Sequence, residues 1–370
     1  MTPEPSPTPP RRRRLRLGAI AVVFALGAAA CGNDDETSIP QSGEIGATEQ
    51  DTVAAEGDAP APEIDFASSS GIDGEDPDFN LSALVWQGYW LSRDHFGPFV
   101  MASGAGIPFE PPMEMMQAAM EMVAQNPGDP VAIPANLFPL QAVFASADPT
   151  LVNDPRDFDP LDFEALRLDP TSFDEIVRVR AQAETMLKES QWAHNFADPH
   201  FGTPDGAFGA QQRFMGQMVA LLSVMQGQYA MANLATDSGL YADSDGTIDH
   251  TGNWVLLHTF ADIASLTGGD VAGGRYANPQ AAPAFADATE MLLEALADRE
   301  PETTDEAASA VRALAYVAAT HDDLADVALE RLATITDALA EMEVTTPAEQ
   351  AAAVAGLVAA GAATGDQAHL

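Results

Sequence analysis

Two helix-start signals that lie 43 residues apart constrain this fold more than any other feature of the sequence. Thr303 followed by Glu306, and Thr346 followed by Glu349, each form the pattern of a capping box, in which the two side chains bond to free N–H groups at a helix start. The residues that follow repeat as well: Ala308, Ala310, Val311 and Leu314 recur as Ala351, Ala353, Val354 and Leu357. A period of about 40–50 residues built from two helices predicts an array of helical hairpins over 251–370.

Less regular helix signals precede this array. Ser172 and Glu175 form another capping box, and Thr251 or Asn253 is expected to cap the helix that begins at Trp254. Residues 129–170 are broken by prolines and are expected to form loops with one or two short helices. Apolar periodicity predicts helices over 81–94, 112–126, 172–195, 208–234, 254–266 and 283–298. The sequence therefore predicts an all-α body, with an irregular helical region over 80–250 before the repeats.

The longest uncharged stretch of that body, residues 214–236, raises the question of a membrane span. Its glutamine, serine and asparagine side chains make it too polar for the lipid interior. We therefore expect this segment to be the central buried helix of the body.

The N-terminus has the three regions of a secretory signal peptide. Five arginines within residues 11–16 precede an uncharged run, 17–30, which closes on small residues before Cys31. Fourteen residues extend only about 21 Å as a helix, which is short of the ~30 Å hydrocarbon core of a bilayer. The pattern predicts a signal peptide over 1–30 and a protein exported across the cytoplasmic membrane.

Ala29, Ala30 and Cys31 resemble the lipobox of bacterial lipoprotein precursors, in which the cysteine is acylated. The resemblance covers the N-terminus alone, and Ala28 stands where the family usually has Leu, Val or Ile. It implies that Cys31, the single cysteine, anchors the protein to the outer side of the membrane. The small residues 28–30 also fit an ordinary cleavage site, which would release the protein, and the arginines fit either general or twin-arginine export.

Residues 31–79 predict a disordered acidic tether behind that cysteine. From Gly32 to Asn80 the chain has fourteen acids, no Lys or Arg, and two aromatics, so it cannot bury enough apolar surface to fold. The whole chain carries 56 acids against 16 basic residues and a formal charge of −40. Nucleic acid is therefore excluded as a partner. The acidity fits either adaptation to high salt or a codon bias against lysine.

The predicted repeats resemble the α/α-toroid proteins, whose inner helices are small and rich in alanine. Their turns often carry Thr-Gly-Asp, as at 364–366 and approximately at 267–270. The resemblance covers 251–370 and implies a toroid-like body. It also implies one alternative function, a carbohydrate-active enzyme with paired carboxylates. No spacing selects such a pair, and Asp198 and Asp249 are the candidates.

Two clusters could hold a divalent metal, although the sequence firmly implies no cofactor. His194, Asp198 and His200 lie at a helix end and could converge on Zn or Cu, or could simply cap the helix and the turn. Asp243, Asp245 and Asp249 are spaced as in the middle of a calcium loop, but both end ligands of such a loop are missing. A solvated acidic turn is the alternative for this second cluster.

Methionines and tryptophans give two further candidates. Met113, Met116 and Met120 share one helix face and, with His95, could bind Cu(I), although the sequence favours soft filler of the core as their role. The four tryptophans could stack on sugars or could pack in the core: Trp86, Trp90, Trp192 and Trp254.

These observations favour a lipid-anchored extracytoplasmic protein. Its helical array is expected to serve as a binding or scaffold module for an envelope protein or glycan. The carbohydrate-active enzyme and a metal carrier are the alternatives that the sequence leaves open.

Overall fold

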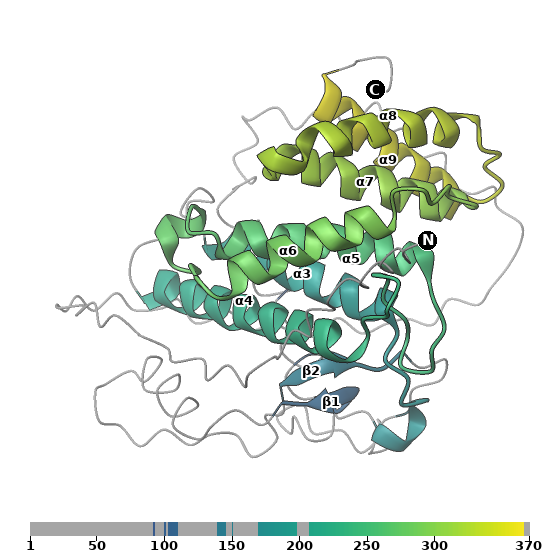
Figure 1. Cartoon of the computed structure of the whole chain (residues 1–370). Coiled ribbons are helices and arrows are strands. Elements are labelled where there is room, and N and C mark those ends of the chain that lie inside the picture. Colours follow the sequence, from purple (N-terminus) through teal and green to yellow (C-terminus); the bar gives the residue numbers. More distant parts are fainter. Residues whose placement is uncertain are drawn as a thin grey trace, which may run out of the picture. The chain divides into compact units, whose positions relative to one another are not determined.

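The computed structural model describes residues 103–109, 139–145, 169–197 and 207–365, together with positions 92, 100 and 150 (Figure 1). The predicted signal peptide, Cys31 and the predicted tether lie outside these residues. None of the helices described here is long and apolar enough to cross a membrane.

Helices dominate the described residues, as the sequence predicts. They are accompanied by one two-stranded antiparallel sheet, β1 (Gly106–Pro108) with β2 (Leu140–Val143), and by short 3-10 turns. The helices are α3 (Val179–Ala197), α4 (Ala207–Asn233), α5 (His250–Thr267), α6 (Ala281–Ala295), α7 (Thr304–Thr320), α8 (Ala325–Glu341) and α9 (Pro347–Thr364). The predicted all-α fold class is confirmed.

The helices form hairpins that stack in sequence order. α3 packs on α4, α5 on α6 and α7 on α8, while α3 also packs on α5, α5 on α7 and α7 on α9. We call α3, α5, α7 and α9 the first row, because each of the first three starts a hairpin. This arrangement is a helical-hairpin array, and helix pairing extends toward the N-terminus beyond its predicted start at residue 251.

Helices of the first row run parallel, since each hairpin returns the chain to its starting end. Near the N-terminal ends, Arg180 of α3 pairs with Asp305 of α7 at 2.6 Å. Between them, a Cβ on Gly252 of α5 would lie 2.8 Å from the backbone N of Arg180, so the two helix starts approach too closely for a side chain. The C-terminal ends of α3, α5 and α7 therefore also lie together.

The centre of the array is α5, and the prediction that residues 214–236 form the central buried helix is wrong. Nearly every residue of α5 from Gly252 onward is buried, whereas α4 leaves positions along its length partly exposed. Contact with α3, α6 and α7 encloses α5, because it belongs to the first row and lies in the middle of it. Large side chains of α5 fill this core: Trp254, Leu256, Leu257, Phe260, Ile263 and Leu266.

The small sheet is attached to the first hairpin through two buried amides. Its strand β2 lies within residues 129–170, where only loops and short helices are expected. Gln182 of α3 accepts a hydrogen bond from Val143 N at 2.9 Å and donates one to Gln141 O at 3.1 Å. Gln226 of α4 donates to Leu140 O at 3.1 Å. The backbone groups of β2 that face the helices are thereby satisfied.

Two predicted helix starts are wrong. Ser172 bonds to Asp169 O, and Glu175 has a positive φ of 55°, so α3 begins only at Val179. α5 begins at His250, before both expected cap residues, Thr251 and Asn253. Asn253 lies inside the helix, and its side chain bonds to the backbone N–H and C=O groups of Tyr241, both at 2.8 Å. The Ser172 side chain thus bonds to a neighbouring turn, and the Asn253 side chain bonds to a more distant segment, in place of the expected caps.

The repeated starts at Thr303 and Thr346 are confirmed. Each threonine side chain accepts a hydrogen bond from the backbone N–H three residues later, at 3.2 Å. At Thr346 the reciprocal bond from its own N–H to Glu349 is also present, at 2.9 Å. Equivalent residues of α7 and α9 can therefore be compared directly.

Candidate functional site

A cluster of polar side chains lies where the C-terminal ends of α3, α5 and α7 meet. At its centre is the carboxylate of Asp262, which is 2% exposed. Ser190 and Tyr316 both donate hydrogen bonds to it, and Nε2 of His194 lies 3.3 Å away without the alignment of a hydrogen bond. His258 packs its ring on Tyr316, with the ring centroids 4.6 Å apart. We call these five residues the polar cluster.

The surroundings keep Asp262 ionised. Burial by itself raises the pKa of a carboxyl group, but the close approach of His194 and the hydrogen bonds from Ser190 and Tyr316 outweigh burial and lower the pKa of Asp262. Burial and the adjacent carboxylate raise the pKa of Tyr316, so the phenol stays protonated. Asp262 is thus a buried negative charge, and each of its two carboxylate oxygens accepts a hydrogen bond from the protein.

His258 stays neutral near pH 7. Burial lowers its pKa to about 4; Asp262 opposes this, and the positive charges of Arg312 and Lys188 add to it. Within the described segments, no hydrogen bond occupies either ring nitrogen of His258. One nitrogen can therefore donate to a ligand and the other can accept.

A second buried polar group lies on α3 next to the cluster. Glu189 is fully buried, accepts one hydrogen bond from Gln226 at 3.1 Å, and has no partner for its Oε2 among the described residues. Burial raises its pKa well above the ordinary value, because a single neutral donor does not compensate for lost water. Burial thus favours the protonated form of Glu189, whereas the partners of Asp262 favour its ionised form.

The other candidate site is the side of α9 that no described helix covers. Its exposed residues lie at helical spacing on one stripe, and Glu349 is the only charged residue of the whole helix. We call this stripe the outer face of α9: Ala351, Val354, Ala355, Val358 and Ala362.

The repeat shows that this exposure is unusual for these positions. Val311 of α7 is 0% exposed, whereas its repeat copy on α9, Val354, is 55% exposed. Likewise, Ala315 of α7 is buried, but its copy Val358 is 47% exposed. Residues that neighbouring helices cover in α7 are therefore uncovered in α9.

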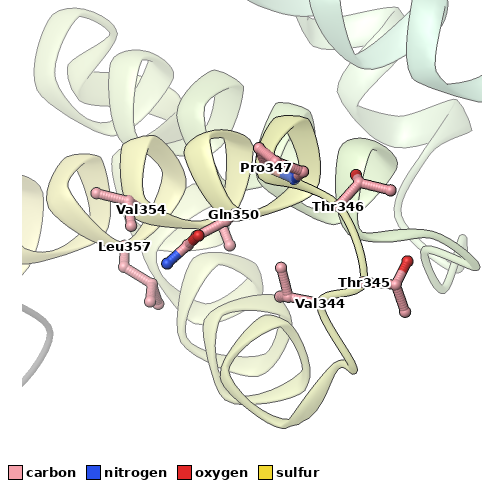
Figure 2. A pocket seen from close by; sticks show the side chains of 8 residues that line it. Val344, Thr345, Thr346, Pro347, Gln350, Val354 and Leu357 are labelled. Carbon is pink, nitrogen blue, oxygen red and sulfur yellow. The ribbon is translucent and has the colours of Figure 1, made fainter. Parts of the chain in front are cut away.

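An open hollow of about 490 Å³ adjoins this face, between α9 and the segment that leads into it (Figure 2). Val344 projects from that segment toward Leu357 and Gln350 on α9 (Figure 2). The remaining lining residues are Thr345, Thr346, Pro347, Ala353 and Val354. The hollow is mostly apolar and carries no charged side chain.

The predicted metal sites lie only partly within the residues that the structure describes. No group of three or more His, Cys, Asp or Glu side chains suited to a metal ion occurs there. His194 contributes to the polar cluster, while Asp198 and His200 lie outside the described residues, as do His95 and Met113, Met116 and Met120 of the proposed copper site.

The acidic turn at 243–249 is used within the fold. Asp243 accepts a hydrogen bond from Val179 N at 2.8 Å, so it caps α3 from a distant part of the sequence. Arg178 lies 3.1 Å from Asp243 and 3.8 Å from Asp245, and supplies the positive charge at this turn. Asp249 lies at the N-cap of α5, and its side chain makes no capping bond.

The other predicted site residues also separate. Trp254 is fully buried and Trp192 is 4% exposed, so these two indoles belong to the core and offer no open face to a sugar. Trp86 and Trp90 lie outside the described residues. Of the two suggested catalytic carboxylates, Asp198 is not described, and Asp249 precedes Asp262 by thirteen residues along α5, about 20 Å.

Sequence reasoning missed the polar cluster, although a signal for it exists. Three helices of the first row each carry two polar residues spaced four apart: Ser190 and His194, His258 and Asp262, Arg312 and Tyr316. Such pairs share a helix face. Their meaning depends on three helices lying side by side, which one-dimensional periodicity cannot show.

Comparison with protein-family models, with curated proteins and with solved structures finds no match to this chain.

Proposed function

We propose that this protein is a lipid-anchored extracytoplasmic scaffold, which binds an envelope protein through the outer face of α9. The lipobox-like sequence at Cys31 supports the anchor, and the helical-hairpin array is a suitable architecture for a binding module. The observation that carries the proposal is the exposure of Val354 and Val358, at positions that helices cover in α7.

The expected occupant is an amphipathic helix of the partner. The array covers the equivalent positions of α7 with helices, and small residues on α9 allow another helix to approach closely. A partner with a basic flank is favoured, because this face is uncharged on a chain whose formal charge is −40. In this docking, the apolar face of the partner helix would lie on the outer face of α9.

Site-specific photo-crosslinking in intact cells tests the docking surface. A photoreactive residue replaces Val354 on α9, and the matched control replaces Val327 on α8, which is 57% exposed. We expect one discrete adduct with an envelope protein from position 354 and none from position 327. Equal adducts from both positions, no adduct, or an adduct with a second copy of this chain would overturn the proposed docking.

A second variant tests the anchor separately. Cys31→Ser should move the protein from the membrane fraction to the released fraction and should remove its detergent-phase partitioning. A wild-type protein found in the cytosol with its leader uncut would refute the anchor. That result would not decide whether a partner docks on the outer face of α9.

A further inference from the structure

Two cations without carboxylate partners flank the polar cluster. Acids greatly outnumber basic residues in this chain, and Arg178, Arg180 and Arg299 all form ion pairs with carboxylates. Arg312 and Lys188 form none within the described segments. Both lie close enough to His258 for their charges to act on its pKa.

The hydrogen bonds of these cations leave most of their donors free for a ligand. Arg312 makes two long bonds of 3.4 Å, to Ala308 O and Ser309 Oγ, although a guanidinium has five N–H donors. Lys188, the only lysine of the chain, bonds to the neutral amide of Gln191 at 3.1 Å and has two further donors. Both side chains are exposed, so a ligand can reach them.

The positions of these groups follow from the array. Arg312 lies one helical turn before Tyr316 on α7, and His258 lies one turn before Asp262 on α5. Since Tyr316 bonds to Asp262 and its ring packs on His258, Arg312 and His258 lie on the same side of the cluster. Lys188 lies two turns after Arg180 on α3, and Arg312 lies two turns after Asp305 on α7, so the ion pair between Arg180 and Asp305 places both cations on the same side of the array. Three helices thus present two cations and one neutral imidazole next to a buried carboxylate.

Such a set of groups fits an oxyanion. Arg312 and Lys188 supply charge-assisted hydrogen bonds, and a neutral His258 can add an N–H donor. Asp262 offers little to a ligand, because its carboxylate is buried and bonded to Ser190 and Tyr316. Repulsion from the distant acidic surface is screened beyond about 8 Å at physiological ionic strength.

We propose that the middle turns of α3, α5 and α7 form a binding site for an oxyanion, with Arg312, Lys188 and His258 as the contacting residues. The oxyanion is either a carboxylate of an acidic glycan or a phosphate group. This site is separate from the docking face of α9, so each of the two proposals can fail without the other.

Binding measurements with three defined probes test the site. The full-length protein is titrated with polygalacturonate, with inorganic phosphate and with uncharged dextran, at fixed ionic strength. We expect binding of polygalacturonate or phosphate, which identifies the source of the oxyanion, and no binding of dextran. Binding of dextran, or of none of the three, would overturn the proposal.

Charge variants locate the binding. Arg312→Gln and Lys188→Gln should each raise the Kd about tenfold. Arg312→Lys should recover part of the lost affinity. Arg180→Gln is the matched control, because it removes one positive charge at the opposite end of α3. An equal loss in the control would show unspecific electrostatic binding and would contradict the site.

A spectroscopic measurement makes the test independent of variant stability. An anion bound beside His258 stabilises the imidazolium and should raise the pKa of His258 in the wild-type protein. The NMR signals of the His258 ring report this shift, and the other histidines serve as internal references. No change at His258 on saturation with the binding probe would place the anion elsewhere and would refute the proposed site.

Discussion

Two buried carboxyl groups of this protein have pKa values that are shifted in opposite directions because of the groups that touch them. Asp262 receives hydrogen bonds from Ser190 and Tyr316 and lies beside His194, so its pKa is lowered despite burial. Glu189 receives one bond from an amide, and burial raises its pKa. Burial by itself therefore does not decide ionisation; the number and charge of the donors do.

Replacement of Glu189 by Gln should stabilise the protein at neutral pH. The folded pKa of Glu189 is raised above its unfolded value, so the group favours folding below about pH 4.5, and its contribution is lost as the pH rises through the folded pKa. In E189Q this dependence disappears. In urea unfolding at pH 4.5, 6.0 and 7.5, the free energy of unfolding of E189Q should increase relative to that of the wild type as the pH rises.

The control for this prediction is Glu290→Gln, an exposed position on α6. This variant should leave the pH dependence of the free energy of unfolding unchanged. A constant loss of stability in E189Q at every pH would show that Glu189 is ionised in the folded protein.

At the scale of elements, helix ends in this fold depend on distant residues as much as on local signals. α9 starts at its own capping box, whereas α3 takes its cap from Asp243, which lies 64 residues further along the chain. The first row also requires close approach: a Cβ on Gly356 of α9 would lie 2.9 Å from the Leu339 side chain and 3.2 Å from the Cα of Ala308. Local and tertiary contacts thus share the definition of these helices.

Loss of the distant cap should destabilise α3. Asp243→Ala removes the acceptor of Val179 N and the buried partner of Arg178, and we expect the free energy of unfolding to fall by about 2 kcal/mol. Asp243→Asn keeps an acceptor and should lower the free energy of unfolding by less. Chemical denaturation measures the free energy of unfolding of each variant, and amide exchange in Asp243→Ala should be fastest at the start of α3.

Asp245→Ala is the matched control, since Asp245 is partly exposed and lies 3.8 Å from the same arginine. Surface pairs of this kind contribute at most about 1 kcal/mol. An equal effect of the two alanine variants would mean that Asp243 does not act as a helix cap.

Gly356→Val should separate α9 from α7. The larger side chain would meet Leu339 and the backbone of Ala308, and overpacking of this kind costs about 1–3 kcal/mol. Ala355→Val, on the exposed side of the same helix, adds comparable volume without a neighbour and should have little effect. If both variants melt at the wild-type temperature with unchanged amide protection in α9, the close contact is not important for stability.

At the scale of the whole molecule, negative charge dominates. Acids outnumber basic residues 56 to 16, and the folded arginines Arg178, Arg180 and Arg299 neutralise only the few carboxylates that they contact. Self-repulsion of the remaining charges opposes the compact state, and salt screens it.

Salt should therefore stabilise the protein near pH 7. We expect the thermal midpoint to rise as NaCl increases from 0.05 to 1 M, because the Debye length falls from above 10 Å to about 3 Å. The same titration near pH 4, where the carboxylates begin to protonate, is the control and should show a smaller rise. A midpoint that is independent of salt at pH 7 would favour codon bias over adaptation to salt as the origin of the acidity.

The sequence by itself determined the helical character and the repeat. Capping boxes at Thr303 and Thr346 act through atoms a few residues apart, and an apolar period of 3.6 residues is visible in one dimension. For the same reason, the bounds of α4 and the end of α5 at Gly268 agree with prediction. The predicted start at Ser172 was wrong because its side chain found another partner, Asp169 O.

Only the tertiary structure decided the candidate sites. The polar cluster joins side chains from α3, α5 and α7 that are up to 126 positions apart, between Ser190 and Tyr316, and no local pattern specifies which helices become neighbours. On the outer face of α9, Ala351, Val354 and Val358 are copies of Ala308, Val311 and Ala315, which are buried on α7, so their exposure depends on which helices pack against them. Burial and ionisation depend on such neighbours, and packing across long loops is what brings them together.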